Sequence, residues 1–347
     1  MVLATRQRGI VEMKKAFVTI VLMLLLLTGA NTVAASDPVG KVASAQKGEQ
    51  RTLSFPKDHS VGSVELAAEN FFDERECGLV AIASAMGTVT VSVPPGQHVL
   101  FEANNKVFEN PSCLNEISAS GIDAIKLSCF SIDDSEDGRC DRALRFVQHF
   151  SKSLKRLNLD RSDATDAGIS ALKKMPNLQV LFCYGSQIKG ACFKDFPQAL
   201  PELSALNLSF CPVSQDNLGY LSHLPKLKYL ALTNLDSNLD VEGVKQLSKC
   251  SALTSLRLQD NRKVNDSCVK YLLALKKLEH LDLRGTSVTM NGIKMLAPLR
   301  LKSLGVPSFL SGSRPQLNKL LPGTKISFAG KVSVDAEVNH NFAPLRY

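Results

Sequence analysis

The sequence of 347 residues contains no tryptophan, and only 6% of its residues are aromatic. It has no phosphate-binding glycine loop, no G-x-S-x-G turn, no H-E-x-x-H zinc motif and no Rossmann glycine series. It also lacks a C-x-x-C pair, so zinc-ribbon and thioredoxin-like sites are not indicated. The six histidines are scattered. We therefore expect a protein that is not an enzyme and that binds no cofactor or metal ion.

The charge is mildly basic, with a formal net charge of +8. Lysine and arginine do not gather in one dense patch, so the sequence does not indicate a nucleic-acid partner. A basic exported protein can still favour acidic partners or anionic surfaces.

The first 35 residues have the composition of a secretory signal peptide. Lys14 and Lys15 precede an apolar run over residues 16–27, and small residues follow up to Ala35. The run is short for a bilayer span. We expect cleavage near Ala35, a secreted or periplasmic location, and no membrane span in the mature chain. The alternative is a membrane anchor formed by an uncleaved N-terminal segment.

One leucine phrase recurs between residues 154 and 306. Apolar residues occupy its first, fourth and sixth positions. The seven copies begin at Leu154, Leu178, Leu203, Leu227, Leu253, Leu278 and Leu301, 23 to 26 residues apart. A fixed period in this range is the signature of a leucine-rich repeat solenoid, in which each repeat buries its apolar face against its neighbours.

A second regular feature follows each phrase. Six repeats carry a residue at one aligned position, and five of the six are good helix N-caps: Thr165, Lys189, Ser214, Asp240, Asn265 and Thr289. Apolar residues four and seven positions later fall on one helix face. The sequence therefore predicts an α/β solenoid with parallel strands on the concave side and helices on the convex side.

This pattern resembles the ribonuclease-inhibitor-like branch of the leucine-rich repeat superfamily, and it is especially similar to the bacterial 24-residue form. Thr165-Asp166-Ala167-Gly168-Ile169 is the closest copy of the Thr-Asp-x-Gly-Leu signature of that form. The resemblance covers residues 120–306. It implies the solenoid fold and protein–protein recognition, but it does not indicate the ligand.

Two segments precede the repeats. Residues 36–51 are small and polar, which is typical of a flexible linker. Residues 52–115 predict a small β-rich N-terminal cap module, with strands at 61–66, 88–93 and 98–102. A Pro-Pro-Gly turn is expected to join the last two strands as a hairpin. The cap would cover the apolar end of the solenoid.

The solenoid is expected to extend over residues 120–328. Residues 122–127 form a divergent eighth copy, and an insertion with an acidic cluster at 133–137 and a helix at 143–154 follows it. The acidic cluster lacks the ligand spacing of a calcium loop. Residues 329–347 have no periodicity and are expected to form a flexible tail.

Nine cysteines divide into two groups. Five occupy core positions of the repeats and are expected to be small buried apolar side chains: Cys183, Cys192, Cys211, Cys250 and Cys268. The other four could form at most two disulfides, in any of three pairings: Cys77, Cys113, Cys129 and Cys140. A Cys129–Cys140 bridge is preferred because it would close a short acidic loop.

The residues that alternate with the strand leucines should face the concave side. They predict an aromatic zone of Phe182, Tyr184 and Tyr229, and a polar zone of Arg257, His280, Asp282 and Arg284. We expect the aromatic rings to be exposed and to act in binding, because aromatic residues and arginine are enriched at binding hot spots. Solvation, or a covering loop, is the alternative. Leu181 and Leu230 should instead face the core.

The sequence therefore predicts an exported protein–protein interaction module that binds an unidentified protein partner through its concave sheet. Two alternatives remain: a structural envelope protein that self-associates, and a secreted effector or enzyme.

Overall fold

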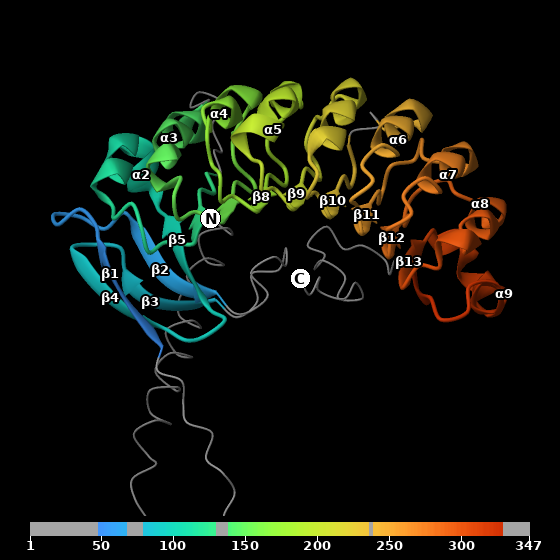
Figure 1. The fold of residues 1–347 in the computed structure, drawn as a ribbon, viewed down its shortest axis with the longest axis horizontal. Helices are drawn as coiled ribbons and strands as arrows, with labels where there is room; N and C mark the ends of the chain where they lie inside the picture. The colour runs from blue at the N-terminus through green and yellow to red at the C-terminus, as the bar shows by residue number, and fades with distance from the viewer. Residues whose placement is uncertain (1–47, 68–78, 130–137, 236–238, 329–347) are drawn as a thin grey trace, which may run out of the picture. The chain divides into compact units, whose positions relative to one another are not determined.

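Short parallel strands form the frame of the molecule. The computed structural model describes residues 48–67, 79–129, 138–235 and 239–328. Within these ranges one sheet of twelve strands has the order β14-β13-β12-β11-β10-β9-β8-β7-β6-β5-β2-β3. The strands lie on the inner side of a curved solenoid and the helices on its outer side (Figure 1). The fold is therefore the predicted α/β leucine-rich repeat solenoid.

The repeat strands pair in register through their leucines. Leu157, Leu181 and Leu206 are direct partners across β7, β8 and β9, and the series continues through Leu304. The strands are β6 (Ala124–Lys126), β7 (Arg156–Asn158), β8 (Val180–Phe182), β9 (Ala205–Asn207), β10 (Tyr229–Ala231), β11 (Ser255–Arg257), β12 (His280–Asp282), β13 (Ser303–Val306) and β14 (Lys325–Phe328). The leucines enter one continuous buried core.

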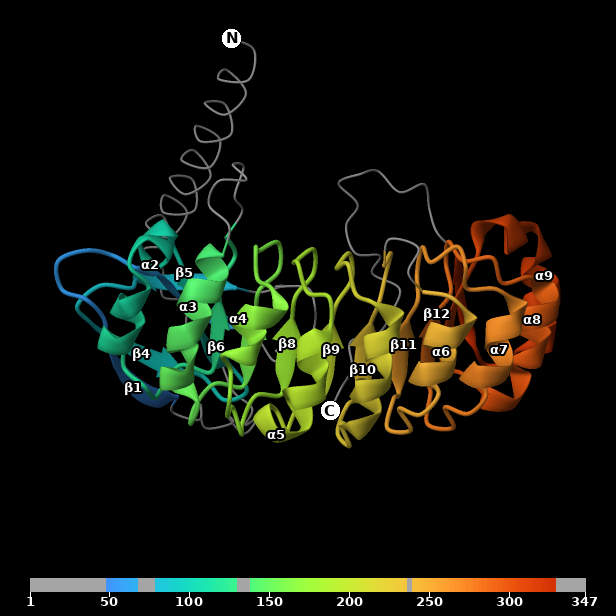
Figure 2. The same cartoon turned by 90° about the horizontal axis from the view of Figure 1, so that it is seen from above.

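The outer side carries short helices of two kinds (Figure 2). The α-helices are α4 (Asp166–Ser170), α5 (Phe196–Ala199), α6 (Val241–Leu247), α7 (Asp266–Leu272), α8 (Met290–Met295) and α9 (Arg314–Leu320). The 3₁₀ helices are η4 (Ala191–Asp195), η5 (Gln215–His223), η6 (Ala297–Leu299) and η7 (Ser308–Ser313). Compact 3₁₀ turns suit connectors that must return the chain to the next strand.

Four of the expected N-caps are confirmed. The side chains of Thr165, Asp240, Asn265 and Thr289 each accept a hydrogen bond from the backbone N–H two residues later, at 3.1, 2.9, 2.9 and 3.2 Å. The expectation for Ser214 is wrong, because its side chain makes no capping hydrogen bond and a 3₁₀ helix follows it.

Aspartates in the first turns of outer helices bond to the next repeat. Asp166 Oδ1 accepts a hydrogen bond from Gly190 N at 2.9 Å, and Asp266 Oδ1 accepts one from Thr289 N at 2.7 Å. Asp141 reaches Thr165 N in the same way, at 2.8 Å. A Cβ added at Gly168 would lie 2.0 Å from Asp141 Oδ1. Glycine is therefore needed at position 168, because the Asp141 carboxylate fills the space that a Cβ on this residue would occupy.

The N-terminal cap divides between two sheets. β1 (Glu49–Ser54) and β4 (Thr88–Val93) form an antiparallel pair, whereas β2 (Gly62–Ala67), β3 (Val80–Ser84) and β5 (His98–Ala103) extend the long sheet. The predicted hairpin between β4 and β5 is therefore wrong: the Pro-Pro-Gly turn is present, but its two strands pair with β1 and with β2 and β6. β1 also begins at Glu49, inside the segment expected to be a linker.

Helices close the join between the cap and the first repeats. They are α2 (Asn105–Glu109), η1 (Pro111–Glu116), α3 (Arg139–Val147) and η3 (Gln148–Phe150). The helix expected at 143–154 thus begins earlier, at Arg139, and ends at Val147. The predicted signal peptide, the acidic cluster and the tail at 329–347 lie outside the described residues. None of the described helices is long and apolar enough to cross a membrane.

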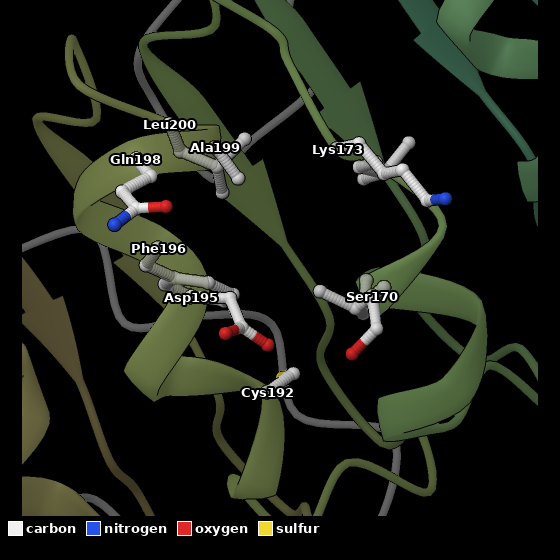
Figure 3. A pocket seen from close by; sticks show the side chains of 10 residues that line it. Ser170, Lys173, Cys192, Asp195, Phe196, Gln198, Ala199 and Leu200 are labelled. Atoms are coloured by element: carbon white, nitrogen blue, oxygen red, sulfur yellow. The ribbon is translucent and has the colours of Figure 1, made fainter.

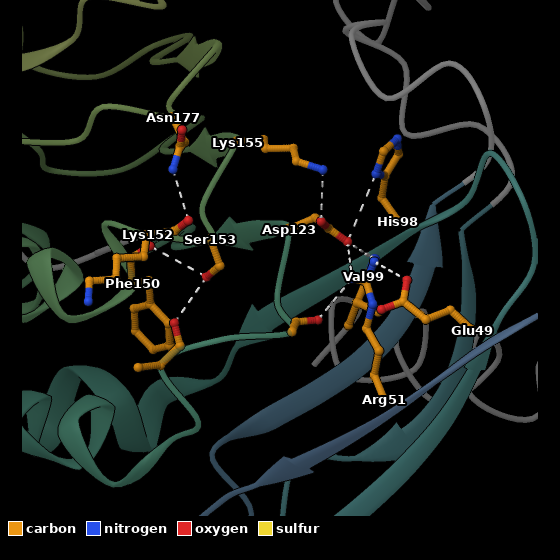
Figure 4. Close-up of polar contacts among 12 residues, drawn as sticks. Glu49, Arg51, His98, Val99, Asp123, Phe150, Lys152, Ser153, Lys155 and Asn177 are labelled. Carbon is orange, nitrogen blue, oxygen red and sulfur yellow. Dashed lines mark hydrogen bonds and ion pairs between the residues drawn. The ribbon is translucent and has the colours of Figure 1, made fainter.

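A buried carboxylate connects the cap to the repeats (Figure 4). Asp123 Oδ2 accepts hydrogen bonds from Arg51 Nη1 at 2.6 Å and from Val99 N at 3.0 Å, and Asp123 Oδ1 lies 3.2 Å from Lys155 Nζ. Burial raises the pKa of Asp123, but these hydrogen bonds and the two cations outweigh it, so the pKa is lowered. The ionised carboxylate therefore holds together β1, β5 and the residue before β7.

Candidate functional site

The first and third residues of each repeat strand face the concave side, and they are here called the inner row. Val180, Phe182, Ala205, Tyr229 and Ala231 form a buried cluster of their own. It is separate from the main core, which contains Leu181 and Leu230. This separation confirms the predicted alternation of side chains between the core and the concave side.

The expectation that the inner-row rings are exposed is wrong. Phe182 has 0% of its surface exposed and Tyr229 has 5%. The two ring centroids lie 6.5 Å apart. The Arg156 guanidinium lies 4.8 Å from the Phe182 centroid, and the Arg257 guanidinium lies 5.4 Å from that of Tyr229. Strands about 4.8 Å apart bring such side chains into contact with one another, so they cover each other.

The predicted polar zone is divided. Arg257 belongs with the Tyr229 ring. Asp282 and Arg284 form a buried ion pair, with 0% and 3% of their surfaces exposed. Arg284 Nε donates to both Asp282 oxygens, at 2.9 and 3.0 Å, and Arg284 Nη2 also donates to Gln259 Oε1 at 3.3 Å. The two charged side chains therefore neutralise each other beneath the concave surface.

His280 lies at the edge of this zone. Its Nδ1 is 2.7 Å from Ser303 Oγ on the next strand. Burial lowers the pKa of His280, and the nearby Glu279 opposes that effect only in part. The ring therefore favours its neutral form and contributes a hydrogen bond between β12 and β13.

A second row follows three residues after each strand, here called the rim. The rim residues of β7 to β12 all have positive φ, between 49° and 68°: Arg161, Gly185, Phe210, Asn234, Asp260 and Gly285. The backbone N–H of Arg161 donates to Tyr184 O at 2.6 Å, and that of Phe210 donates to Thr233 O at 2.8 Å. The rim thereby continues the backbone ladder beyond the three-residue strands.

Two rim side chains, Arg161 and Phe210, meet Tyr184, which directly precedes the rim residue Gly185 of the repeat between them. The three residues are here called the rim triad. The Tyr184 and Phe210 centroids lie 5.0 Å apart, and the Arg161 guanidinium lies 6.0 Å from the Tyr184 centroid. Arg161 is exposed, Tyr184 is half-buried, and 42% of the Phe210 surface is exposed. Tyr184 was predicted as a binding residue, but Arg161 and Phe210 were not.

The sequence held a signal for the rim. Four of its six aligned positions carry glycine, asparagine or aspartate, the residues that tolerate a left-handed backbone. Arg161 and Phe210 stand out against that pattern. Aligning this position along with the leucines would have identified both.

A shallow hollow lies on the outer side, between α4 and the η4–α5 segment (Figure 3). It has a volume of about 150 Å³, and Ser170, Lys173, Cys192 and Asp195 are among its lining residues. Burial raises the pKa of Cys192 far above its usual value. A thiol held protonated in this way is a poor nucleophile.

The described cysteines are free, buried thiols. The preferred Cys129–Cys140 bridge is not formed: Cys140, at the start of α3, contacts Leu127 O with its sulfur at 3.9 Å. Cys113 is likewise free, and Cys77 lies outside the described residues. Burial raises the pKa of Cys211 to about 11 and that of Cys250 to about 12, so these cysteines behave as core side chains.

No group of three or more histidine, cysteine, aspartate or glutamate side chains within the described ranges is placed to hold a metal ion. The candidate site for binding is the concave face, where the rings and guanidinium of the rim triad reach the surface.

No protein-family model matches the sequence. No curated protein is significantly similar to it. Among solved structures, the chain is similar to an internalin of Listeria monocytogenes, with a TM-score of 0.38 and 14% identity over 60% of this chain and 76% of that one. It is also similar to TLR13 from a TLR13–ssRNA13 complex, with a TM-score of 0.41 and 19% identity over 65% of this chain and 35% of that one. The leucine-rich repeat fold itself is evident in the pairing and register of this chain's own strands.

Proposed function

We propose that this leucine-rich repeat protein is an exported protein–protein interaction module that recognises its partner on the concave side. Repeat solenoids use extended concave surfaces for binding. The observation that supports the proposal is the rim triad, where two aromatic rings and a guanidinium from three successive repeats meet at the surface. Exposed aromatic groups of this kind mark interaction sites.

A photo-crosslinking experiment tests the concave side against the convex side. A photoreactive amino acid replaces Tyr184 in one variant and Tyr220 of η5, which is 40% exposed on a helix, in the other. We expect a discrete crosslinked protein in envelope extract from the Tyr184 position only. Equal crosslinking from Tyr220, or none from Tyr184, would contradict binding on the concave side.

The proposal of export is supported by the composition of residues 1–35. We expect the mature chain to begin at Ser36 or within a few residues of it. Mass spectrometry of the N-terminal peptide measures this. Recovery of residues 16–30 in the mature protein would instead favour the membrane anchor.

Self-association is a second candidate, and one observation favours it. β3 is the last strand of the long sheet among the described residues, it carries no charged side chain, and Val80 and Ile82 are 63% and 41% exposed. Uncharged apolar edge strands can pair with another copy. Light scattering after size exclusion should show a dimer that Ile82→Lys converts to a monomer. A monomeric wild-type protein excludes this role.

A further inference from the structure

Phe210 is held in a conformation that its side chain does not favour. Its φ is 60°, and Asn, Asp or Gly occupies the aligned rim position in three later repeats. A left-handed backbone is unfavourable for a residue with a Cβ, because the Cβ comes too close to the following carbonyl oxygen. Phe210 also leaves 42% of its surface in water. Other repeats of the chain therefore place a residue that tolerates positive φ at this position, whereas this repeat has phenylalanine.

Arg161 repeats the same exception two repeats earlier. Its φ is 56°, and its side chain is exposed. Strained residues that a fold retains are concentrated at sites where the side chain has a function. Arg161 and Phe210 approach Tyr184 from the repeats before and after it, so both exceptions belong to one surface feature.

Hydrogen bonds hold the backbone of the rim triad in place. Backbone hydrogen bonds hold Arg161 and Phe210 to the following repeat, and Tyr184 N donates to Asp160 Oδ1 at 2.8 Å. The Tyr184 and Phe210 rings also contact each other, and the Arg161 guanidinium lies over the Tyr184 ring. Groups that are already ordered lose little conformational entropy on binding.

We propose that the rim triad binds an extended segment of a partner protein in which an aromatic or aliphatic side chain lies next to a carboxylate. This deepens, and rests on, the proposed function. The apolar side chain would pack on Phe210 and Tyr184, and the carboxylate would pair with the Arg161 guanidinium, which suits two-point recognition of carboxylates. The charge of the segment is complementary to the exposed Arg161 guanidinium.

The test pans a displayed library of random peptides, each about twelve residues long, against the full chain. We expect enriched peptides to carry Asp or Glu within two positions of Phe, Tyr, Trp or Leu. A synthetic peptide of the consensus should then bind in a titration, and its binding should weaken as salt is raised.

Three variants locate the contact. Phe210→Asn suits the backbone but removes the ring, and it should weaken peptide binding about thirtyfold, as expected for loss of a hot spot. Arg161→Gln should weaken it about tenfold and abolish most of the salt dependence. Phe309→Ala, which removes a 62% exposed ring in η7, is the matched control and should leave binding unchanged.

The outcomes separate this proposal from the proposed function. Peptides that bind but are insensitive to Phe210→Asn and Arg161→Gln overturn the rim triad while leaving a binding module intact. Enrichment of basic peptides, or displacement of the consensus peptide by a single-stranded oligonucleotide, overturns the assignment to an acidic protein segment. A library that yields no binder contradicts both. Melting curves exclude misfolding as the cause, because Phe210→Asn should not lower the melting temperature.

Discussion

The inner row and the rim triad of the concave face contain the same types of side chain, buried in the first and exposed in the second. In each, an arginine lies over an aromatic ring that contacts a second ring: Arg156, Phe182 and Tyr229 in the inner row, and Arg161, Tyr184 and Phe210 in the rim triad. Phe182 is completely buried, whereas 42% of Phe210 is exposed. The backbone of the rim is left-handed, and that of the inner row is extended.

The difference in burial assigns the inner row to stability and the rim triad to recognition. A guanidinium over a buried ring helps to hold adjacent strands together. The same pair at the surface contributes less to stability and leaves its polar and apolar faces open to a partner. Composition alone therefore does not identify a binding residue on a repeat protein, because coverage by neighbouring side chains decides the role.

Phe182→Ala should have the largest effect on stability. Removing a fully buried phenylalanine ring costs about 3–5 kcal/mol, comparable with the 2–5 kcal/mol expected for Leu181→Ala in the main core. Tyr184→Ala, in the rim triad, should cost much less. Chemical denaturation measures all three. A Phe182→Ala protein that is as stable as the wild type would show that the inner row is not structural.

Asp282→Ala tests the charged end of the inner row. It leaves the Arg284 guanidinium buried without its carboxylate, which should destabilise the fold by about 3 kcal/mol. Replacing both residues, as Asp282→Leu with Arg284→Met, should restore much of the loss, since a buried ion pair can often be exchanged for apolar groups. If the double variant is no more stable than the single one, the pair has another role.

Asp123→Asn tests the carboxylate that precedes the inner-row strand β6. Losing charged hydrogen bonds should cost about 1.5–3 kcal/mol at neutral pH. Because folding lowers the pKa of Asp123 below its usual 3.8, its contribution is complete above that pH and is lost as the pH falls through the lowered value. Unfolding curves from pH 6 to 2 should therefore converge for wild type and variant. A constant gap at all pH values would contradict this linkage.

Phe210→Asn should have the smallest effect, and of opposite sign. Asparagine tolerates positive φ, so relief of the left-handed strain should stabilise the fold by about 1 kcal/mol. Asn234, at the aligned position, is the natural precedent, and Asn234→Phe is the reverse control. Destabilisation by Phe210→Asn would show that the ring contributes to packing and would blur the contrast between the rim and the inner row.

The repeat architecture was predictable from the sequence because it rests on local, periodic information. The leucine spacing predicted the register of Leu157, Leu181 and Leu206, and β4 lies where the period-two pattern placed it. The pairing of β4 with β1 was not predictable, because it joins residues about forty positions apart for which no period exists. Proximity in sequence favoured the hairpin with β5 instead.

The candidate site was predictable only in part. Alternation along a strand correctly placed Phe182 and Tyr229 on the concave side, but it gives no information about what covers them. Arg156 and Arg257, which cover them, each come from the adjacent repeat strand. Phe210 was missed because it lies beyond the strand, where the backbone and not hydrophobicity carries the signal.

The hydrogen bonds and ion pairs of Asp123 also make the two ends of the solenoid differ in local stability. A solenoid whose repeats contact only their neighbours opens from its ends. At one end Asp123 binds β1, β5 and Lys155 together, while at the other β14 pairs only with β13 among the described strands. Fraying should therefore start from the C-terminal repeats and travel toward β6, so that amide exchange is slowest near the cap. A protease would accordingly shorten the folded protein from its C-terminal side, leaving the rim triad among the last parts to be lost.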